Sequence, residues 1–165
     1  MIRENLQVLM ECHPFYESLN RRILEQDYDL IYNPLVSGYN SNVIAHRTLG
    51  DLNTEGIKLV KDWILTIIKQ HYPVFEYSID GWIAKYNKGD HTLEHDHIPA
   101  GFSFVYFVKT PKGSSPLVFS TSGKRIKAEE GKLVIFPACM RHHVPKNKCD
   151  ERVTFAGNVS IINNS

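Results

Sequence analysis

Apolar residues in the first half of the chain recur with a helical period in two segments. FYESLNRRILEQ, residues 15–26, has an apolar side chain at every fourth position. Residues 54–72 show the same period more strongly, with isoleucine and valine along one face, and Pro73 follows the last of them. Both patterns predict amphipathic helices, whose apolar stripes must be covered by a sheet or by each other. The Asn-, Ser- and Gly-rich segment between them, residues 32–50, predicts irregular structure or short edge strands.

After residue 78 the pattern changes to short runs of β-branched and aromatic residues separated by glycine and proline. The spacing of the runs is roughly the 8–12 residues typical of a sandwich or barrel. The runs are SIDGWIAKY, GFSFVYFVK, SPLVFS, KRIKA, KLVIFP and RVTFAGNVSII. Helices followed by many strands predict an α+β chain that is mainly β, with a helical front part of about residues 1–75 and an antiparallel core of about residues 78–163.

The composition is that of one globular domain spanning residues 1–165. With 22% charged residues and a formal net charge of +1, it gives no electrostatic reason to expect nucleic acid or an anionic membrane as a partner. No run approaches the 18 apolar residues of a membrane span, and the first residues lack the apolar core of a secretory signal, so we expect a cytoplasmic protein. The cysteines show no CxxC spacing and are expected to be reduced thiols.

Histidines concentrate in two places that carry candidate chemistry. On a strand, His95 and His97 would project to the same face, about 6.6 Å apart, and could converge on one ion. An HxH pair by itself is weak evidence, because such pairs also occur on exposed strands and in loops. A second pair, His142 and His143, follows the apolar run KLVIFP and strengthens the prediction of a metal site.

Arg152 begins the last β-type run, ten residues beyond His142. Imidazole ligands without thiolates suit non-haem iron, zinc or manganese. The planar fork of a guanidinium suits a carboxylate, so Arg152 is the candidate anion anchor. Thr154, two residues further along and therefore on the same face of a strand, could add a hydroxyl donor.

These features occur in a defined order: W-x3-Y-x2-G-x5-H-x-H, then SFVYF, PLVF, GKLVIFPACMRHHVP and ERVTFAGN. In this order they resemble the iron(II)- and 2-oxoglutarate-dependent oxygenases, in particular the small hydroxylases of phages and bacteria related to the prolyl hydroxylases. The resemblance covers about residues 80–160. It implies a double-stranded β-helix, or jelly roll, with N-terminal helices packed on one sheet.

The resemblance also implies residue roles. His95 matches the first metal ligand and His142 the distal ligand, with His143 pointing the other way, while Arg152 matches the residue that binds the distal carboxylate of 2-oxoglutarate. Trp82 is expected to fill the barrel. The further candidates near the co-substrate or metal are Tyr86, Tyr106, Thr154 and Asn158.

The chain departs from the family pattern at the second ligand position, where His97 stands in place of the usual aspartate. Three arrangements remain open. His95, His97 and His142 form a three-histidine site, which we favour; a bulge turns Asp96 inward and restores a carboxylate; or two histidines bind the ion and water or another anion completes its shell.

The function implied by the resemblance is a non-haem dioxygenase that uses Fe(II), 2-oxoglutarate and O2. Such an enzyme couples decarboxylation of 2-oxoglutarate to succinate with oxidation of a C–H bond, commonly its hydroxylation. The primary substrate stays open between a peptidyl proline, a free amino acid and another small molecule. The alternatives are a non-catalytic, cupin-like metal-binding jelly roll and an oxygenase that dealkylates nucleic acid, although the near-neutral charge disfavours the latter.

Overall fold

The computed structural model describes residues 7–33 and 41–162. Its larger sheet has, in spatial order, β1 (Leu9–Cys12), β10 (Lys132–Pro137), β7 (Phe102–Lys109), β12 (Arg152–Ile162), β5 (Glu76–Tyr86), β4 (His46–Arg47) and β2 (Ile31–Tyr32). The smaller sheet has β3 (Val43–Ile44), β6 (His91–His95), β11 (His142–Val144), β8 (Leu117–Phe119) and β9 (Arg125–Ile126). The helices are α1 (Tyr16–Leu24) and α2 (Glu55–His71).

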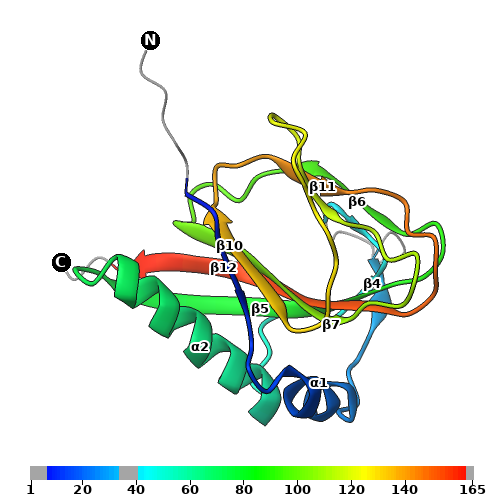
Figure 1. Cartoon of the computed structure of the whole chain (residues 1–165), viewed down its shortest axis with the longest axis horizontal. Helices are drawn as coiled ribbons and strands as arrows, with labels where there is room; N and C mark the ends of the chain where they lie inside the picture. The colour runs from blue at the N-terminus through cyan, green and yellow to red at the C-terminus, as the bar shows by residue number, and fades with distance from the viewer. Residues whose placement is uncertain (1–6, 34–40, 163–165) are drawn as a thin grey trace.

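The two sheets face each other, and both helices lie on the outer face of the larger sheet (Figure 1). All strand pairs in the described residues are antiparallel. This arrangement confirms the predicted fold class, a mainly β double-stranded β-helix with N-terminal helices on one sheet. The front part is not only helical, however, because β1 joins one edge of the larger sheet and β4 and β2 extend the other.

The segment between the helices contributes the short strands that its composition suggested. β3 pairs with β6 in the smaller sheet, whereas β4 pairs with β5 in the larger one, so this segment passes from one sheet to the other. Residues 34–40 of the predicted irregular segment lie outside the described residues. The segment therefore forms part of the wall at one end of the jelly roll.

Apolar side chains from the helices and from the larger sheet form one core. Ile57, Ile64 and Ile68 of α2 are fully buried and belong to the same cluster as Ile23 of α1 and Phe155 of β12. Burying a side chain of this size contributes roughly 1.5–3 kcal/mol. The helical period read from the sequence is thus the period of the face that packs on the sheet.

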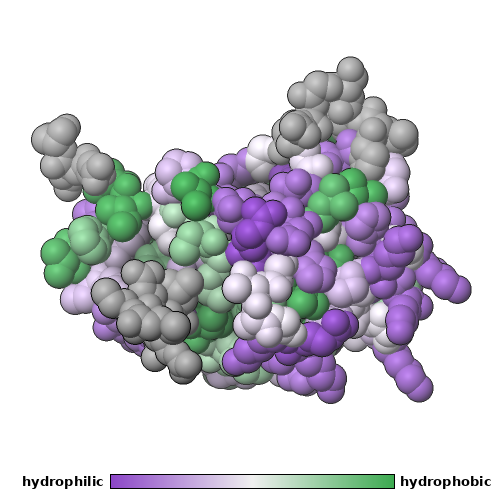
Figure 2. Space-filling model, turned by 90° about the horizontal axis from the view of Figure 1, so that it is seen from above, coloured by the Kyte–Doolittle hydropathy of each residue, from purple (hydrophilic) through white to green (hydrophobic). Residues whose placement is uncertain are grey.

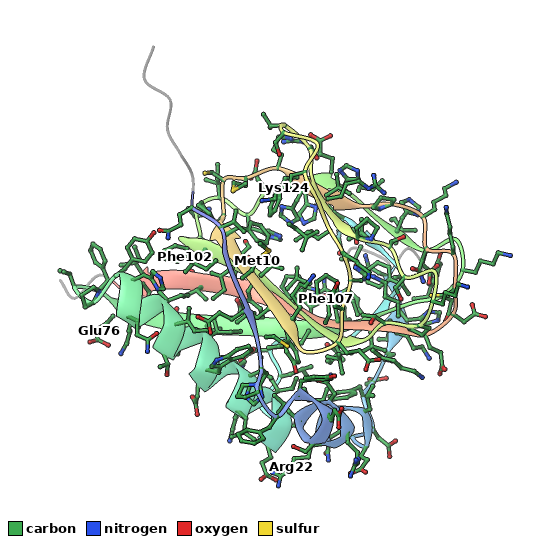
Figure 3. All side chains as sticks on the ribbon, viewed as in Figure 1. Met10, Arg22, Glu76, Phe102, Phe107 and Lys124 are labelled. Atoms are coloured by element: carbon green, nitrogen blue, oxygen red, sulfur yellow. The ribbon has the colours of Figure 1, made fainter. Side chains whose placement is uncertain are left out.

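The opposite face of the larger sheet lines the space between the two sheets. On β7, Val105 and Phe107 point into this space, where Phe107 packs with Phe119 and Phe136. Figure 3 labels Phe107, which lies between the two sheets. The strand is therefore buried on both faces, which explains why SFVYF reads as a continuous apolar run rather than an alternating one.

The surface of the molecule is unevenly apolar. Seen from above, apolar residues gather mainly at the end near the C-terminus, and hydrophilic residues dominate the opposite end (Figure 2). The exposed apolar side chains near the C-terminus include Val74, Phe75, Ile161 and Ile162. Across residues 7–33 and 41–162, neither helix has the length and apolar character that a membrane crossing requires.

Two glycines allow the central strands of the larger sheet to approach closely. Gly81 of β5 lies opposite Gly157 of β12. A Cβ added at Gly157 would collide with the carbonyl oxygen of Asp80 and lie 2.7 Å from Cζ of Phe104. A side chain at this position would therefore force apart the two longest strands, one of which carries Arg152 at its start.

We expect Gly157→Ala to lower the free energy of unfolding by on the order of 3 kcal/mol, because overpacking against backbone atoms leaves no side chain free to move away. Urea denaturation would measure the change. Gly101→Ala is the matched control, since its Cβ would meet no atom closer than 3.4 Å, and it should shift stability by less than about 1 kcal/mol. Equal midpoints for the two variants would contradict the close-approach argument.

Candidate metal and co-substrate site

Three imidazoles meet at one end of the smaller sheet. His95 on β6 and His142 on β11 are direct cross-strand partners. Nε2 of His95 lies 3.0 Å from Nε2 of His97, and the ligand atoms of all three histidines lie within 4.8 Å of one another. Within the described part of the chain, these residues form the group that could hold a metal ion.

His97 reaches this group from a turn and not from the strand. β6 ends at His95, and the backbone N–H of His97 donates to the carbonyl of Ala138 at 2.8 Å. The expectation that both histidines lie on one strand is therefore wrong, because His97 follows the end of β6, but the two imidazoles converge as expected. The ring centroids of His95 and His97 are only 4.6 Å apart, because the turn brings His97 back toward the strand end.

Hydrogen bonds orient two of the three rings. Nδ1 of His95 lies 2.6 Å from the carbonyl oxygen of Leu93, and Nδ1 of His142 lies 2.8 Å from that of Met140. A carbonyl oxygen can only accept, so each Nδ1 carries the proton and each Nε2 keeps its lone pair. This is the arrangement by which outer hydrogen bonds usually orient metal-binding histidines.

Burial keeps the imidazoles uncharged at neutral pH. Burial, followed by the nearby charge of His95, lowers the pKa of His142 to about 3 and that of His97 to about 4. Burial also lowers the pKa of His95. A ligand histidine must be neutral to bind a cation, so the triad needs no deprotonation at pH 7.

Asp96 lies outside this group. Its Oδ1 accepts a hydrogen bond from the backbone N–H of Ile98 at 3.3 Å, and its Oδ2 lies 3.6 Å from Nη1 of Arg141. Arg141 is held in turn by Glu94, to which its Nε donates at 2.7 Å. The bulge that would turn Asp96 inward is not seen, because the turn and Arg141 engage the carboxylate on the outer side.

The triad faces a cavity between the sheets, and Arg152 lines the same cavity. The Arg152 side chain starts on β12, is 1% exposed, and donates from Nε to the carbonyl of Ser115 at 2.9 Å. Its guanidinium carbon lies 4.6 Å from the ring centroid of Tyr86 and 5.5 Å from that of Phe107. The guanidinium is thus fixed by one hydrogen bond and by contacts with two aromatic rings.

The remaining two nitrogens of Arg152, Nη1 and Nη2, have no hydrogen-bond partner among the described residues. Burial lowers the pKa of Arg152, but an arginine remains charged at pH 7. No acidic side chain belongs to the cavity lining that the described residues form. A buried cation with an unused pair of NH2 groups requires an anion, and its fork fits a carboxylate.

Two of the other predicted residues lie at the cavity and one lies beyond it. Tyr86 lines the cavity, and its hydroxyl is 2.7 Å from Oγ1 of Thr92; Thr154 lines it two residues from Arg152. Asn158 is on the same face of β12 but outside the lining, where its Oδ1 accepts a hydrogen bond from Ser103 at 3.0 Å.

The assignment of Tyr106 to the co-substrate is wrong. Its side chain points to the helix face of β7, and its hydroxyl donates to Oδ1 of Asn20 on α1 at 2.6 Å. The reason is strand alternation: Val105 and Phe107 point into the jelly roll, so Tyr106 must point out of it. Because the run SFVYF is apolar on both faces, its sequence did not show which residues point into the jelly roll.

The structure also adds residues that the sequence did not indicate. Arg47 of β4 places its guanidinium carbon 4.5 Å from the ring centroid of Trp82, and both line a hollow beside His95 and His97. Trp82 was expected to fill the barrel, but it is half-buried and lines the cavity as well. Arg47 belongs to no motif, so only the pairing of β4 with β5 could reveal its position.

No protein-family model and no curated protein matches the chain, but solved structures match its fold. Over 96% of its length it is similar to the viral collagen prolyl hydroxylase of Paramecium bursaria Chlorella virus-1 in a 2OG complex, with a TM-score of 0.72, 13% identity and 98% of that chain covered. A prolyl-4-hydroxylase of Pseudomonas putida gives a TM-score of 0.68 at 16% identity, with 96% of this chain and 95% of that chain covered.

An oxidoreductase of the 2OG-Fe(II) oxygenase family from Burkholderia pseudomallei gives a TM-score of 0.69 at 14% identity, with 93% of this chain and 84% of that chain covered. At these identities the likeness establishes the fold. The neighbours come from the family that the sequence motifs resemble. Fold and site together define a double-stranded β-helix with a histidine triad and a buried arginine on the lining of one cavity.

The adjacent histidines of β11 provide a direct test of the triad. We expect His142→Ala to weaken binding of Mn²⁺, measured by isothermal titration, by more than about 100-fold, because loss of an outer partner alone costs 10- to 100-fold. His143 is the matched control, since its Nδ1 pairs with Oγ of Ser120 at 2.9 Å, away from the triad. His143→Ala should change the affinity by no more than about twofold. Equal losses in the two variants would rule out the assignment.

The charge of the triad can be tested at His97. We expect His97→Asp to tighten Fe²⁺ binding by about tenfold, because a carboxylate compensates part of the charge of the ion in a partly buried site. His97→Asn provides the neutral control of the same size, and it should bind no more tightly than the unchanged protein. Weaker binding by the aspartate variant than by the asparagine variant would contradict this reasoning.

Proposed function

We propose that this protein is a non-haem iron(II)- and 2-oxoglutarate-dependent dioxygenase that oxidises a C–H bond. One observation carries the proposal. A buried guanidinium with two unpartnered NH2 groups lines the same cavity as three neutral imidazoles. This combination suits a small molecule that chelates a metal ion at one end and carries a carboxylate at the other, as 2-oxoglutarate does.

Each part of the co-substrate has a counterpart in the cavity. His95, His97 and His142 would hold the iron through imidazole nitrogens, which suit this metal. Arg152 would bind the far carboxylate through Nη1 and Nη2, with the Thr154 hydroxyl beside it. When bound, iron(II) and 2-oxoglutarate supply the activation of O2, with succinate and carbon dioxide as products.

The charges favour binding of the co-substrate. The triad is neutral and Arg152 is cationic, so a bound divalent metal and the guanidinium together bring three positive charges into the cavity. The two carboxylates of 2-oxoglutarate offset most of this charge. No acidic group in the described lining competes for Arg152, so the ligand would supply the carboxylate that pairs with its guanidinium.

The walls of the cavity suit oxidative chemistry. Val105, Leu117, Phe136 and Val144 line it with apolar surface. Such walls exclude water, strengthen the electrostatic contacts inside and limit side reactions of reactive species. The protein thus contributes position and exclusion of water, while the metal and co-substrate contribute the redox chemistry.

The primary substrate would enter beside the triad. Arg47, Trp82 and Asn42 line the hollow that reaches His95 and His97 from the outside. Two of the similar structures are named prolyl hydroxylases, which supports hydroxylation of a peptidyl proline or of a related small molecule. We assign the reaction as hydroxylation and leave the choice between these substrates to assay.

Neither alternative accounts for the cavity as well. A cupin-like metal-binding protein would use the histidines, but it would leave Arg152 buried without an anion. A nucleic-acid dealkylase would need a basic surface; Lys109 and Lys127 instead pair with Glu151 and Glu129, and the formal net charge is only +1.

The decisive experiment is an anaerobic titration of the iron(II)-loaded protein with 2-oxoglutarate. Its readout is the visible charge-transfer band that bidentate chelation produces. We expect the band to appear, and admission of O2 to yield succinate. Arg152→Met should keep iron binding but weaken 2-oxoglutarate binding by about 30- to 4,000-fold, since truncating a buried charge partner costs about 2–5 kcal/mol.

Arg125→Met is the control for this experiment, because Arg125 is an exposed arginine on β9 that does not line the cavity. It should change the affinity for 2-oxoglutarate by no more than about twofold. If no band forms with the unchanged protein, the proposed function is wrong. If Arg152→Met loses iron and 2-oxoglutarate together, the separate roles of the triad and the arginine are wrong.

A further inference from the structure

Asn147 is a buried asparagine in the loop between β11 and β12 whose polar groups are all engaged. It is 2% exposed. Its backbone N–H donates to the carbonyl of Asp90 at 2.7 Å, and its carbonyl accepts from the N–H of Gly89 at 2.8 Å. These bonds join its loop to the turn between β5 and β6, so the residue has a fixed backbone position.

The side-chain amide of Asn147 then bridges two further segments. Oδ1 accepts a hydrogen bond from the backbone N–H of Ser115 at 2.9 Å. Nδ2 donates to the carbonyl of Tyr86 at 3.2 Å and to that of Cys149 at 2.6 Å. The amide therefore connects the end of β5, the segment before β8 and the loop that leads into β12.

Two of the residues that Asn147 binds, Ser115 and Tyr86, also orient Arg152, through other groups. The carbonyl of Ser115 accepts the Nε hydrogen bond of Arg152 at 2.9 Å, and the ring of Tyr86 lies 4.6 Å from its guanidinium carbon. Asn147 itself makes no hydrogen bond to Arg152 in the described structure. Asn147 therefore acts on the arginine indirectly, through Ser115 and through Tyr86.

The orientation of the guanidinium decides which atoms face the ligand. With Nε bound to Ser115, Nη1 and Nη2 of Arg152 are the pair left to contact an anion. Two parallel N–H···O bonds to a carboxylate need this planar fork to be correctly aimed, and a small misplacement of a positioning group has a large effect on binding. Asn147 fixes the backbone of both residues, through the N–H of Ser115 and the carbonyl of Tyr86, and so positions the Ser115 carbonyl and the Tyr86 ring that set this aim.

We propose that Asn147 is a positioning residue that aims the Arg152 fork and thereby sets the selectivity of the site for dicarboxylate over monocarboxylate 2-oxo acids. The proposal rests on the proposed function, since it assumes that Arg152 binds the far carboxylate of 2-oxoglutarate. It assigns a role to a loop residue that lines neither the cavity nor the metal group.

Two ligands separate positioning from general stability. 2-Oxopentanoate has the same carbon chain as 2-oxoglutarate but a methyl group in place of the far carboxylate. Any loss of folded protein or of metal lowers the affinity for both ligands equally. Only a change where the far carboxylate binds, at the Arg152 fork and the Thr154 hydroxyl beside it, alters the ratio of the two affinities, so the ratio is the readout.

The experiment is isothermal titration of the Mn²⁺-loaded full chain with each 2-oxo acid, after separate measurement of the Mn²⁺ affinity and the melting temperature. We expect the unchanged protein to prefer 2-oxoglutarate. Asn147→Ala should reduce this preference by about tenfold, which corresponds to 1.4 kcal/mol. Its Mn²⁺ affinity and its affinity for 2-oxopentanoate should change by no more than about twofold.

Ser114→Ala is the matched control. Ser114 lies in the same segment and donates from Oγ to the carbonyl of Pro111 at 2.7 Å, and its Oγ also lies 3.5 Å from Sγ of Cys149, but it makes no hydrogen bond to Ser115, Tyr86 or Arg152. This variant should keep the preference. In an Arg152→Met background, where no fork is left to aim, Asn147→Ala should cause no further change in the ratio.

Asn147→Ser is the second variant, for the case that the alanine variant is unfolded at the assay temperature. Its hydroxyl is too short to serve both Ser115 and Tyr86, so we expect a smaller loss of preference with the fold retained. If a folded Asn147 variant keeps the full preference, or loses affinity for both ligands equally, Asn147 is only structural and the inference is wrong. If the unchanged protein shows no preference, the proposed function fails, and the inference with it.

Discussion

A guanidinium that is 1% exposed, with two unpartnered nitrogens and no carboxylate in the described cavity lining, is the constraint around which the site is built. Burying an unpaired charge costs several kcal/mol even after relaxation. The aromatic rings of Tyr86 and Phe107 and the carbonyl of Ser115 offset part of this cost. The remainder is recovered only when an anion reaches Nη1 and Nη2, so a fork without a protein partner favours ligand binding at the expense of stability.

The fold determines that this cation and the histidine triad share one cavity. His95 and His142 meet because β6 and β11 pair in register, although 46 residues of sequence lie between them. Arg152 belongs to the opposite sheet and faces the same interior. A jelly roll thus brings a metal group from one sheet and an anion anchor from the other to a common space without requiring long loops.

Charge links the histidine triad and Arg152, because a metal ion on the triad and the guanidinium would bind the same dianionic ligand. The described structure places Asp96 against Arg141, so the imidazoles alone face the position where an ion would bind. A neutral ligand set leaves the charge of a divalent ion uncompensated until a dianionic ligand arrives. In the function that we propose, a bound metal would therefore strengthen binding of 2-oxoglutarate, while Asn147 would influence only the binding of the far carboxylate.

Local patterns were sufficient to predict the two helices and a strand-rich second half of sandwich or barrel type, because the period of apolar residues reports directly which face of an element is buried. The jelly-roll class followed from the resemblance of the ordered motifs to a known family. The residue types at 95, 142 and 152 also indicated metal and carboxylate chemistry before any coordinates. The sequence could not show to which face of its strand Tyr106 points, because the run is apolar on both faces. It also did not show the turn that carries His97 or the positions of Arg47 and Asn147. These depend on pairing between distant segments, whose register is decided only when the whole sandwich packs, and no local period encodes it.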